Sequence, residues 1–268
     1  TNNDIIWLAL WKVNEKEAPP GLGLILLKKL ENINPNKTIA VLGINQDHPR
    51  IYKAINYDTG IMDHFYFTNP DIKNFRVLMN DKHKKLPTPK ISSCKLISKN
   101  ILISDLDKID YNYNSKNFSN KKTAKYFINK YLNNPFYNYQ LFHLQKTDAQ
   151  IALIVLRVIN IENSKIIRVI DFEGDESLIS HAGDFFLKII KKEKAEYIDF
   201  LQYGIQRKYF LRCGFELLNT HNTIIVPNYF EPFIQKNIPL LFSYKFNNDK
   251  IRIFKGDGDQ DRPSLVAK

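Results

Sequence analysis

Apolar runs and helical patterns alternate along the first third of the chain. Residues 5–13 form an almost wholly apolar run and residues 38–44 form a second, as expected of strands that are covered on both faces. Between them, the leucine spacing within residues 21–33 predicts a helix. We expect a short helix over residues 49–56 and a strand over residues 64–68. The predicted order is strand, loop, helix, strand, helix, strand.

The same order of elements recurs further along the chain, which is a weak internal repeat at the scale of a domain. Helices are predicted over residues 121–132, 178–192 and 205–212, and strands over residues 140–146, 151–159, 166–172, 197–201, 239–246 and 250–254. Residues 82–90 are charged, contain two prolines and show no periodicity, which is typical of a linker. We therefore divide the chain into halves at residues 1–86 and 87–268.

The first half contains a glycine pair between a strand and a helix. The run Pro20-Gly21-Leu22-Gly23-Leu24 places two glycines one residue apart at the predicted helix start. Backbone N–H groups can converge there without side chains in the way, and the helix N-terminus adds partial positive charge, so the turn could hold a diphosphate. The alternative is a tight strand-to-helix turn with no ligand.

Downstream spacing links this turn to a known superfamily. Asn45 follows the second strand and Tyr52 lies seven residues later. In this order, the chain resembles the GCN5-related N-acetyltransferase (GNAT) superfamily. It departs from that pattern at Ala18, where an Arg or Gln usually opens the loop, and at Asn56-Tyr57, where a Gly-Phe-like pair is usual.

The resemblance implies an acyl-CoA site in the first half. The thioester would lie between two strands that separate, with its oxygen bound by backbone N–H groups near residues 8–10. Tyr52 would donate a proton to the departing thiolate, and Asn45 would bind the pantetheine arm. The acyl-CoA-binding residues implied in this way are Leu8, Leu10, Pro20, Gly21, Leu22, Gly23, Leu24 and Asn45. Acetyl-CoA or another acyl-CoA would be the acyl donor.

Two residues are candidates for the base that deprotonates the acceptor amine. Together with Tyr52 they make up the predicted catalytic residues. Asp4 is the one carboxylate in a suitable position on the strand before the glycine turn, and its alternative is a solvated strand end. His64 lies on a strand expected to border the acceptor side, and its alternative is a structural histidine that faces the core.

The second half lacks the features that would hold coenzyme A. Its loop after residues 166–172 reads Glu173-Gly174-Asp175-Glu176, whose carboxylates would repel a diphosphate. Tyr203 stands at the Asn position and Phe210 at the Tyr position. We expect a degenerate half whose cleft is left free to shape the acceptor pocket. The fold class is therefore α/β (α+β), with two GNAT-like halves, each a mixed and largely antiparallel sheet flanked by helices.

Tandem halves of this kind resemble the sugar-nucleotide N-acyltransferases of bacterial surface-polysaccharide pathways, such as those for lipopolysaccharide, capsule or anthrose. The resemblance includes residues 254–263, and it implies acyl transfer to the amine of a nucleotide-linked deoxyamino sugar. The candidate substrate-binding residues are Trp11, Asp171, Glu173, Tyr229, Lys255 and Arg262. Two alternatives stay open: a solvated C-terminal tail, and Tyr229 as a core aromatic. Compared with a complete GNAT half, the first half appears truncated at its N-terminus.

Composition narrows the remaining classes. The 268 residues carry 39 Lys and Arg against 28 Asp and Glu, a net charge of +11, which is either a solvated surface or an attraction to an anionic small molecule. The lysine clusters lack the interleaved aromatics of a nucleic-acid track, so no nucleic acid is expected. Asp257, Asp259 and Asp261 alternate as in a calcium loop, but Arg262 and Lys268 stand where glycine and glutamate are required, so no metal is expected.

Two cysteines and no apolar stretch near 18 residues favour a cytoplasmic protein with no membrane insertion. The oligomeric state is not indicated. Two other functions remain open. A Fem-type aminoacyltransferase also has tandem GNAT-like halves but uses aminoacyl-tRNA, and the glycine turn argues against it. A non-catalytic module could keep the fold and only bind acyl-CoA.

Overall fold

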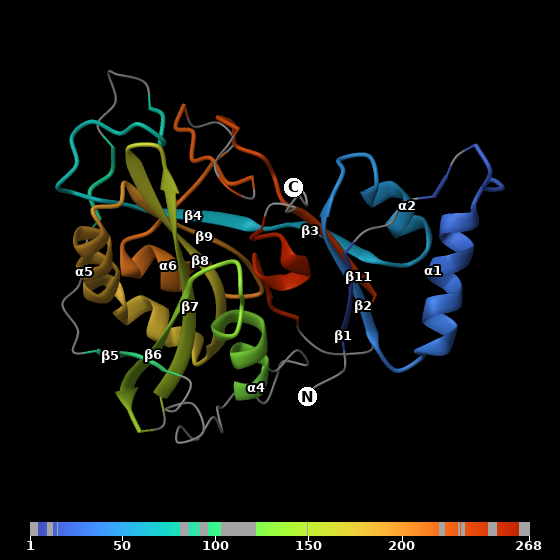
Figure 1. Cartoon of the computed structure of the whole chain (residues 1–268), viewed down its shortest axis with the longest axis horizontal. Helices are drawn as coiled ribbons and strands as arrows, with labels where there is room; N and C mark the ends of the chain where they lie inside the picture. Colours follow the sequence, from blue (N-terminus) through green and yellow to red (C-terminus); the bar gives the residue numbers. More distant parts are fainter. Residues whose placement is uncertain are drawn as a thin grey trace.

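Two β-sheets, each covered by helices, make up the computed structural model (Figure 1). It describes residues 5–9, 13–14, 16–80, 86–89, 91, 96–102, 122–148, 150–219, 223–229, 231, 234–245 and 251–262. The first sheet has the strand order β1 (Ile5–Leu8), β2 (Thr38–Ile44), β11 (Leu241–Lys245) and β3 (Asp58–Ile61). The pair β1 and β2 is parallel, and the other neighbours are antiparallel.

The helices α1 (Leu22–Ile33) and α2 (Pro49–Ala54) cover one face of the first sheet. Their apolar residues pack with the side chains of β2 in a core that includes Leu27, Val41, Tyr52 and Tyr57. Because β1 and β2 are parallel, the chain must cross over between them, and α1 is that crossover. The turn that precedes α1 is thereby placed beside the ends of both strands.

The second sheet is larger and follows the same plan. Its strand order is β10 (Glu216–Leu217), β4 (Asp63–Thr68), β9 (Tyr197–Tyr203), β8 (Ser164–Gly174), β7 (Gln150–Ile161), β6 (Tyr139–Thr147) and β5 (Ile97–Asn100), with β12 (Ile253–Phe254) paired to β9. The parallel pair is β8 and β9. The 3₁₀ helix η2 (Glu176–His181) and the helices α5 (Gly183–Glu193) and α6 (Arg207–Cys213) pack on one face.

A further helix, α4 (Ala124–Phe127), continues into the π-helical turn η1 (Ile128–Leu132) and packs against β6, β7 and β8. Together the two elements confirm the prediction of helix over residues 121–132, with a change of helix type in the middle. The predicted helix over residues 178–192 is instead divided into η2 and α5. Ala182 and Gly183 lie at this break. A Cβ atom at Gly183 would lie 2.9 Å from the backbone oxygen of Cys213, so a larger residue would not fit there without a shift of the chain.

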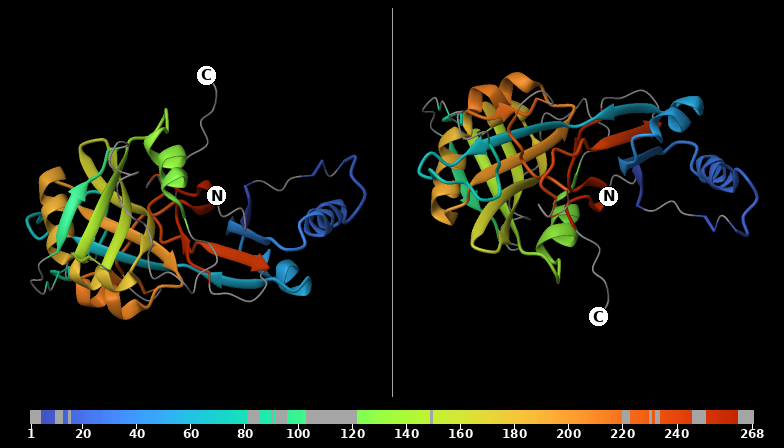
Figure 2. Two further views of the ribbon diagram at one scale, coloured as in Figure 1. Left: turned by 90° about the horizontal axis from the view of Figure 1, so that it is seen from below. Right: turned by 90° about the horizontal axis from the view of Figure 1, so that it is seen from above.

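Each sheet contains a strand from the other part of the chain. The strand β4 follows β3 directly but lies between β9 and β10 of the second sheet. In return β11, which comes late in the chain, lies between β2 and β3 of the first sheet. Figure 2 shows β3 and β4 as one run from the first sheet into the second, with β11 beside β3. The two sheets are therefore joined by reciprocal strand exchange.

This exchange bears on the predicted division into residues 1–86 and 87–268, which stays a prediction. A cut at that position would remove β4 from the second sheet and β11 from the first, leaving a gap between hydrogen-bonded strands in each. Side-chain contacts also hold β11 in the first sheet. Lys245 of β11 binds Glu31 of α1 at 2.9 Å, and the Glu31 carboxylate also accepts a hydrogen bond from the Tyr57 hydroxyl at 2.8 Å.

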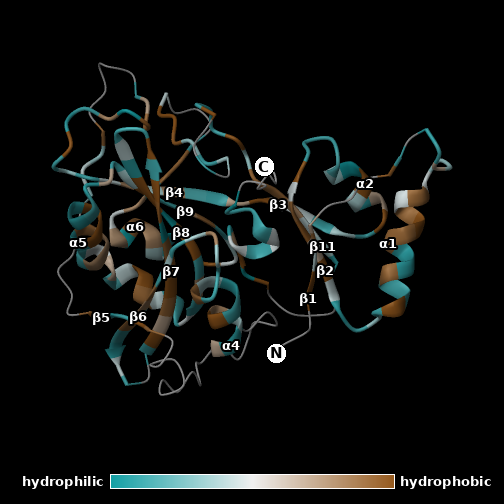
Figure 3. Ribbon diagram, viewed as in Figure 1, coloured by the Kyte–Doolittle hydropathy of each residue, from teal (hydrophilic) through white to brown (hydrophobic). Residues whose placement is uncertain are grey.

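The helix α1 differs from the pattern expected of a core helix. Of the three leucines that predict it, Leu27 is buried and Leu30 is partly buried, but Leu24 is exposed. Ile25 and Leu26 are also exposed, and Figure 3 shows hydrophobic residues along this helix at the edge of the molecule. Leu24 is turned toward the cavity described below.

The strand exchange makes Phe242 of β11 a central residue. Its side chain is 1% exposed, between Leu42 of β2 and Gly60 of β3. We expect Phe242→Ala to lower the free energy of unfolding by about 3–5 kcal/mol because it leaves a buried cavity. Phe136→Ala is the matched control, since Phe136 is 71% exposed, and should cost less than about 0.5 kcal/mol. Urea unfolding measures both; equal small effects would contradict the buried position of β11.

Candidate functional site

A cavity of about 460 Å³ opens where β1 and β2 separate. Their pairing ends at Leu8 and Val41, while β2 continues to Ile44. Residues at the start of α1 and residues of α2 both line the opening. The described residues that line the cavity are Leu8, Ala9, Val13, Gly21, Gly23, Leu24, Val41, Leu42, Gly43, Ile44, Asn45, His48, Ile51, Tyr52 and Gln260.

The predicted glycine turn lies at this cavity. Gly21 is the N-cap of α1 and adopts the left-handed conformation, with φ of 81°. A non-glycine residue would be strained there. Gly23 lies in the first turn of the helix, and no acidic residue occurs in that turn. The backbone N–H groups of a helix N-terminus, with their partial positive charge, therefore face a space large enough for a ligand.

Tyr52 and Asn45 also line this cavity. Asn45 follows β2, and Tyr52 is in α2, where its ring packs 5.3 Å from the ring of Tyr57. Burial raises the pKa of the Tyr52 hydroxyl to about 12. The hydroxyl therefore keeps its proton at neutral pH and can act as a proton donor. The structure thus brings Leu8, the two glycines, Leu24, Asn45 and Tyr52 to one cavity, and their roles in acyl-CoA binding stay predictions.

Other predicted site residues in the first half are placed differently. Pro20 and Leu22 lie beside Gly21 in the turn but do not belong to the described lining of the cavity. Asp4, Leu10 and Trp11 lie outside the described residues. Whether they contribute to the site stays a prediction.

One lining residue comes from the far end of the sequence. Residues 251–262 are here called the C-terminal segment, and their 3₁₀ turn η3 (Asp257–Asp259) packs against β1 and β2 on the face opposite α1 and α2. A side chain at Gly258 would contact Leu42 at 3.4 Å and Trp7 at 3.6 Å. Two residues later, Gln260 reaches Gly43 at the cavity. No local signal in the sequence indicates this contact, because it joins positions more than 200 residues apart.

The same segment fills the corresponding opening in the second sheet. The parallel pairing of β8 and β9 covers residues 167–169 and 198–200, beyond which the strands separate. There β12 pairs with Gln202 and Tyr203 of β9, and the Gly256 N–H donates to the Ile170 carbonyl at 2.8 Å. The prediction that this second cleft is free is therefore wrong. The chain itself occupies it.

Buried charges hold the segment there. The Lys122 ammonium donates to Asp171 and lies 3.1 Å from Asp257, and the Tyr131 hydroxyl donates to Asp171 at 2.6 Å. Burial alone would lower the pKa of Lys122, but the carboxylates of Asp171 and Asp257 raise it overall. Burial raises the pKa of Asp257. Both carboxylates are thus engaged inside the protein.

Most of the predicted acceptor-binding residues of the second half likewise form buried contacts with other parts of the chain. Glu173 is buried, binds Arg252 at 2.8 Å and accepts from the Lys122 backbone N–H at 3.1 Å. Lys255 is buried and donates to the Asn228 carbonyl, and burial lowers its pKa well below the usual range. Asp171, Glu173 and Lys255 bind other parts of the chain, so we leave them out of the acceptor site.

Two predicted acceptor residues are more accessible. Arg262 is partly exposed and donates from Nε to the Tyr139 hydroxyl at 3.1 Å. Tyr229 is 43% exposed, so it is not a core aromatic. Contact of either side chain with an acceptor stays a prediction. The polar C-terminal tail is not solvated as a whole, because Asp257 and Asp261 are both buried.

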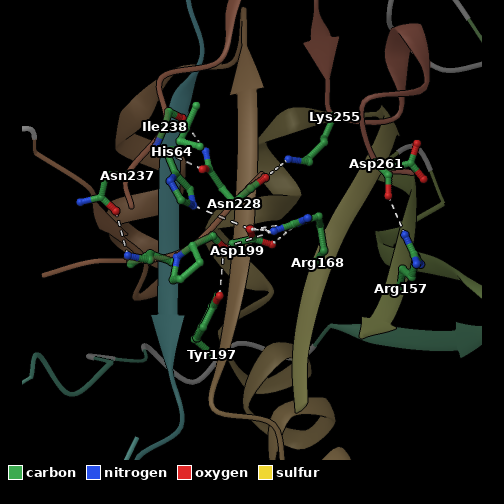
Figure 4. A network of polar contacts seen from close by, with 12 residues as sticks. His64, Arg157, Arg168, Tyr197, Asp199, Asn228, Asn237, Ile238, Lys255 and Asp261 are labelled. Atoms are coloured by element: carbon green, nitrogen blue, oxygen red, sulfur yellow. Dashed lines mark hydrogen bonds and ion pairs between the residues drawn. The ribbon is translucent and has the colours of Figure 1, made fainter. Parts of the chain in front are cut away.

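His64 lies apart from this cavity, on the polar face of the second sheet (Figure 4). It lines a separate cavity of about 620 Å³, which shares no described lining residue with the first. Its Nε2 has no hydrogen-bond partner among the described residues and lies 3.8 Å from the Asp199 carboxylate. That carboxylate is bound by the buried Arg168 at 2.8 Å. The structure therefore does not bring His64 together with Tyr52.

Comparison with known proteins supports the fold. No family model matches the chain, and no curated protein matches it. A conserved protein of unknown function from Enterococcus faecalis, described as a probable N-acyltransferase, has a similar structure, with a TM-score of 0.51 and 7% identity. The match covers 86% of this chain and 51% of that protein, so this chain spans about half its length.

A GCN5-related N-acetyltransferase from Anabaena variabilis aligns with a TM-score of 0.46 and 9% identity, over 85% of this chain and 51% of that protein. One from Sphaerobacter thermophilus aligns with a TM-score of 0.42 and 9% identity, over 87% and 70%. The predicted fold class, two sheets of mixed strand direction flanked by helices, is confirmed.

Within the described part of the chain, no group of three or more His, Cys, Asp and Glu residues could hold a metal ion. Nor is any helix in that part long and apolar enough to span a bilayer.

The buried position of His64 has a consequence for stability. Burial lowers its pKa to about 4, Asp199 opposes this shift, and Lys255 and Arg168 add to it. Between the unfolded value of 6.5 and the folded value, the unfolded chain binds a proton that the folded chain does not. Stability is therefore lost as the pH falls through this range, by about 2 kcal/mol at pH 5.

We expect His64→Gln to remove this component. The difference in unfolding free energy between wild type and His64→Gln should shrink by about 2 kcal/mol on going from pH 7 to pH 5. Urea unfolding at the two pH values measures it. His48→Gln is the control, because His48 is exposed. A difference that is the same at both pH values would show that His64 titrates normally.

Proposed function

We propose that this protein is an acyl-CoA-dependent N-acyltransferase whose donor site is the cavity between β1 and β2. The observation that carries the proposal is the convergence of the Gly21–Gly23 turn, Asn45 and Tyr52 on one cavity. The turn offers helix N-terminal N–H groups for a diphosphate. The apolar walls formed by Leu8, Val41 and their neighbours suit the pantetheine arm. The fold similarity to a probable N-acyltransferase is in keeping with this proposal.

The reaction would be direct transfer between two bound substrates. The amine nitrogen of the acceptor attacks the thioester carbon, and the C–S bond breaks as the tetrahedral intermediate collapses. Tyr52 gives its proton to the departing thiolate. The proton lost by the amine goes to a base or to water. Cys213, the one free cysteine of the described residues, is buried in the second half and its pKa is raised by burial, so an acyl-cysteine intermediate is not part of the proposal.

We propose a nucleotide-linked deoxyamino sugar as the acceptor, following the resemblance to surface-polysaccharide enzymes. Arg262 and Tyr229 remain the candidate residues for its phosphates and its base or sugar. The net charge of +11 favours an anionic ligand of this kind. A module that only binds acyl-CoA would show binding without turnover, and an aminoacyl-tRNA enzyme would show activity that ribonuclease removes.

The glycine turn gives the first test. Gly23→Asp places a carboxylate at the helix N-terminus inside the cavity, where it would repel the diphosphate. We expect the Kd for acetyl-CoA, measured by calorimetry, to rise at least about 100-fold. Leu26→Asp is the matched control, since it adds the same charge at an exposed position of the same helix, and its Kd should change less than threefold. Equal effects of the two variants would place the coenzyme elsewhere.

Tyr52 gives the second test. Tyr52→Phe removes only the hydroxyl, so kcat should fall by about 100-fold while the Kd for acetyl-CoA stays within threefold. Thiol release from acetyl-CoA with a panel of nucleotide-linked amino sugars measures the rate. Tyr57→Phe is the control, because the Tyr57 hydroxyl binds Glu31 and does not belong to the described cavity lining. A Tyr52→Phe enzyme with unchanged kcat would rule out the proton-donor role.

A further inference from the structure

Gln260 is the one described lining residue of the donor cavity that does not come from residues 8–52. Its carboxamide packs against the backbone of Gly43 in β2. A Cβ atom at Gly43 would lie 2.5 Å from Gln260 Oε1 and 2.7 Å from Nε2. Gly43 also has φ of 83°, a conformation that other residues rarely adopt. Glycine at this position therefore permits a close approach that any side chain would prevent.

The position of Gln260 is fixed from both sides. Before it, Asp257 lies 3.1 Å from the buried Lys122 ammonium. After it, Asp261 accepts a hydrogen bond from Tyr139 through its carboxylate and one from Arg157 through its carbonyl, the latter at 2.6 Å. All of these contacts are buried. The segment therefore presents Gln260 to the cavity from a rigid support, as a wall and not as a mobile cover.

The wall stands on the side of the opening away from α1. The glycine turn and α2 lie on the helix-covered face of the first sheet, while the C-terminal segment packs on the opposite face. A ligand whose diphosphate lies at Gly21 would extend between β1 and β2 toward Gly43 and Gln260. The reacting end of that ligand, and not its nucleotide, would meet the carboxamide.

We propose that Gln260 contacts the acyl group of the donor and sets the upper limit of its length, so that acetyl-CoA is accepted and longer acyl chains are excluded. This inference rests on the proposed function, because it takes the cavity as the acyl-CoA site. The inference means that a residue of the second half sets the acyl-chain specificity of a cavity formed mainly by the first half.

The test is a change of chain-length preference in the full chain. Gln260→Ala removes the side chain beyond Cβ and opens room for about two methylenes. Because each buried methylene is worth about fourfold in affinity, two methylenes should raise the ratio of butyryl-CoA to acetyl-CoA affinity by about 15-fold. Gln260→Met has a similar volume and should keep the wild-type ratio. Gln206→Ala, at an exposed position, is the unrelated control.

Calorimetric titration with acetyl-CoA and with butyryl-CoA measures the ratio without an acceptor. A ratio within twofold of wild type in Gln260→Ala would overturn the inference. Should that variant fail to fold, Gln260→Asn shortens the side chain by one methylene and should shift the ratio by about fourfold; no shift would again overturn it. If the wild-type chain binds neither thioester, the proposed function itself fails, and that result is distinct from binding with unchanged preference.

Discussion

Reciprocal strand exchange is the constraint on which the rest of the structure depends. An interior position of the first sheet is filled by β11, and an interior position of the second sheet is filled by β4, so each sheet contains a strand from the other part of the chain. Both strands hydrogen-bond on their two edges, so neither sheet is complete without the other. The exchange also fixes where the chain runs afterwards. The C-terminal segment follows β11 and is thereby brought to the point where both parallel strand pairs separate.

The two openings show how one architecture can be used in two ways. In the first, glycines and apolar side chains line an open cavity at a helix N-terminus. In the second, Asp171 and Glu173 stand at the end of β8, and their charges are compensated by Lys122 and Arg252. Burying such charges is costly unless each finds a partner. The segment that supplies Asp257 and Arg252 completes this pairing, and it occupies the second opening.

Local sequence patterns predicted much of the first half because its signals are local. The glycine pair, Asn45 and Tyr52 lie within 32 residues of one another, and the consecutive elements β1, α1, β2 and α2 place them together. The strand β2 agrees with its prediction at both ends, because a buried apolar run has clear polar limits. The loop over residues 173–176, with one glycine and three carboxylates, is predicted from equally local sequence to be unsuited to a diphosphate.

What the sequence did not reveal depends on contacts between distant segments. Alternation of apolar and polar residues predicts a strand at β11 but not which sheet it enters. The tail around Asp257 and Asp261 looks solvated by composition, yet Lys122, Tyr139 and Arg157 neutralise or bind these residues from positions about 100 residues or more away. For the same reason Gln260 carries no signal. Gln260 stands out only because the fold packs it against Gly43 at the cavity.

The dependence of Gln260 on Lys122 gives the second half a part in the geometry of the first. Removal of the Lys122 charge would leave Asp171 and Asp257 as two buried carboxylates close together, and at least one would then have to bind a proton or move toward water. Movement of Asp257 would carry Gln260 with it, since only two residues separate them. Small displacements at a reacting centre cost far more in rate than in binding. Under the proposed function, the second half therefore acts as a rigid support for the donor cavity on the other sheet.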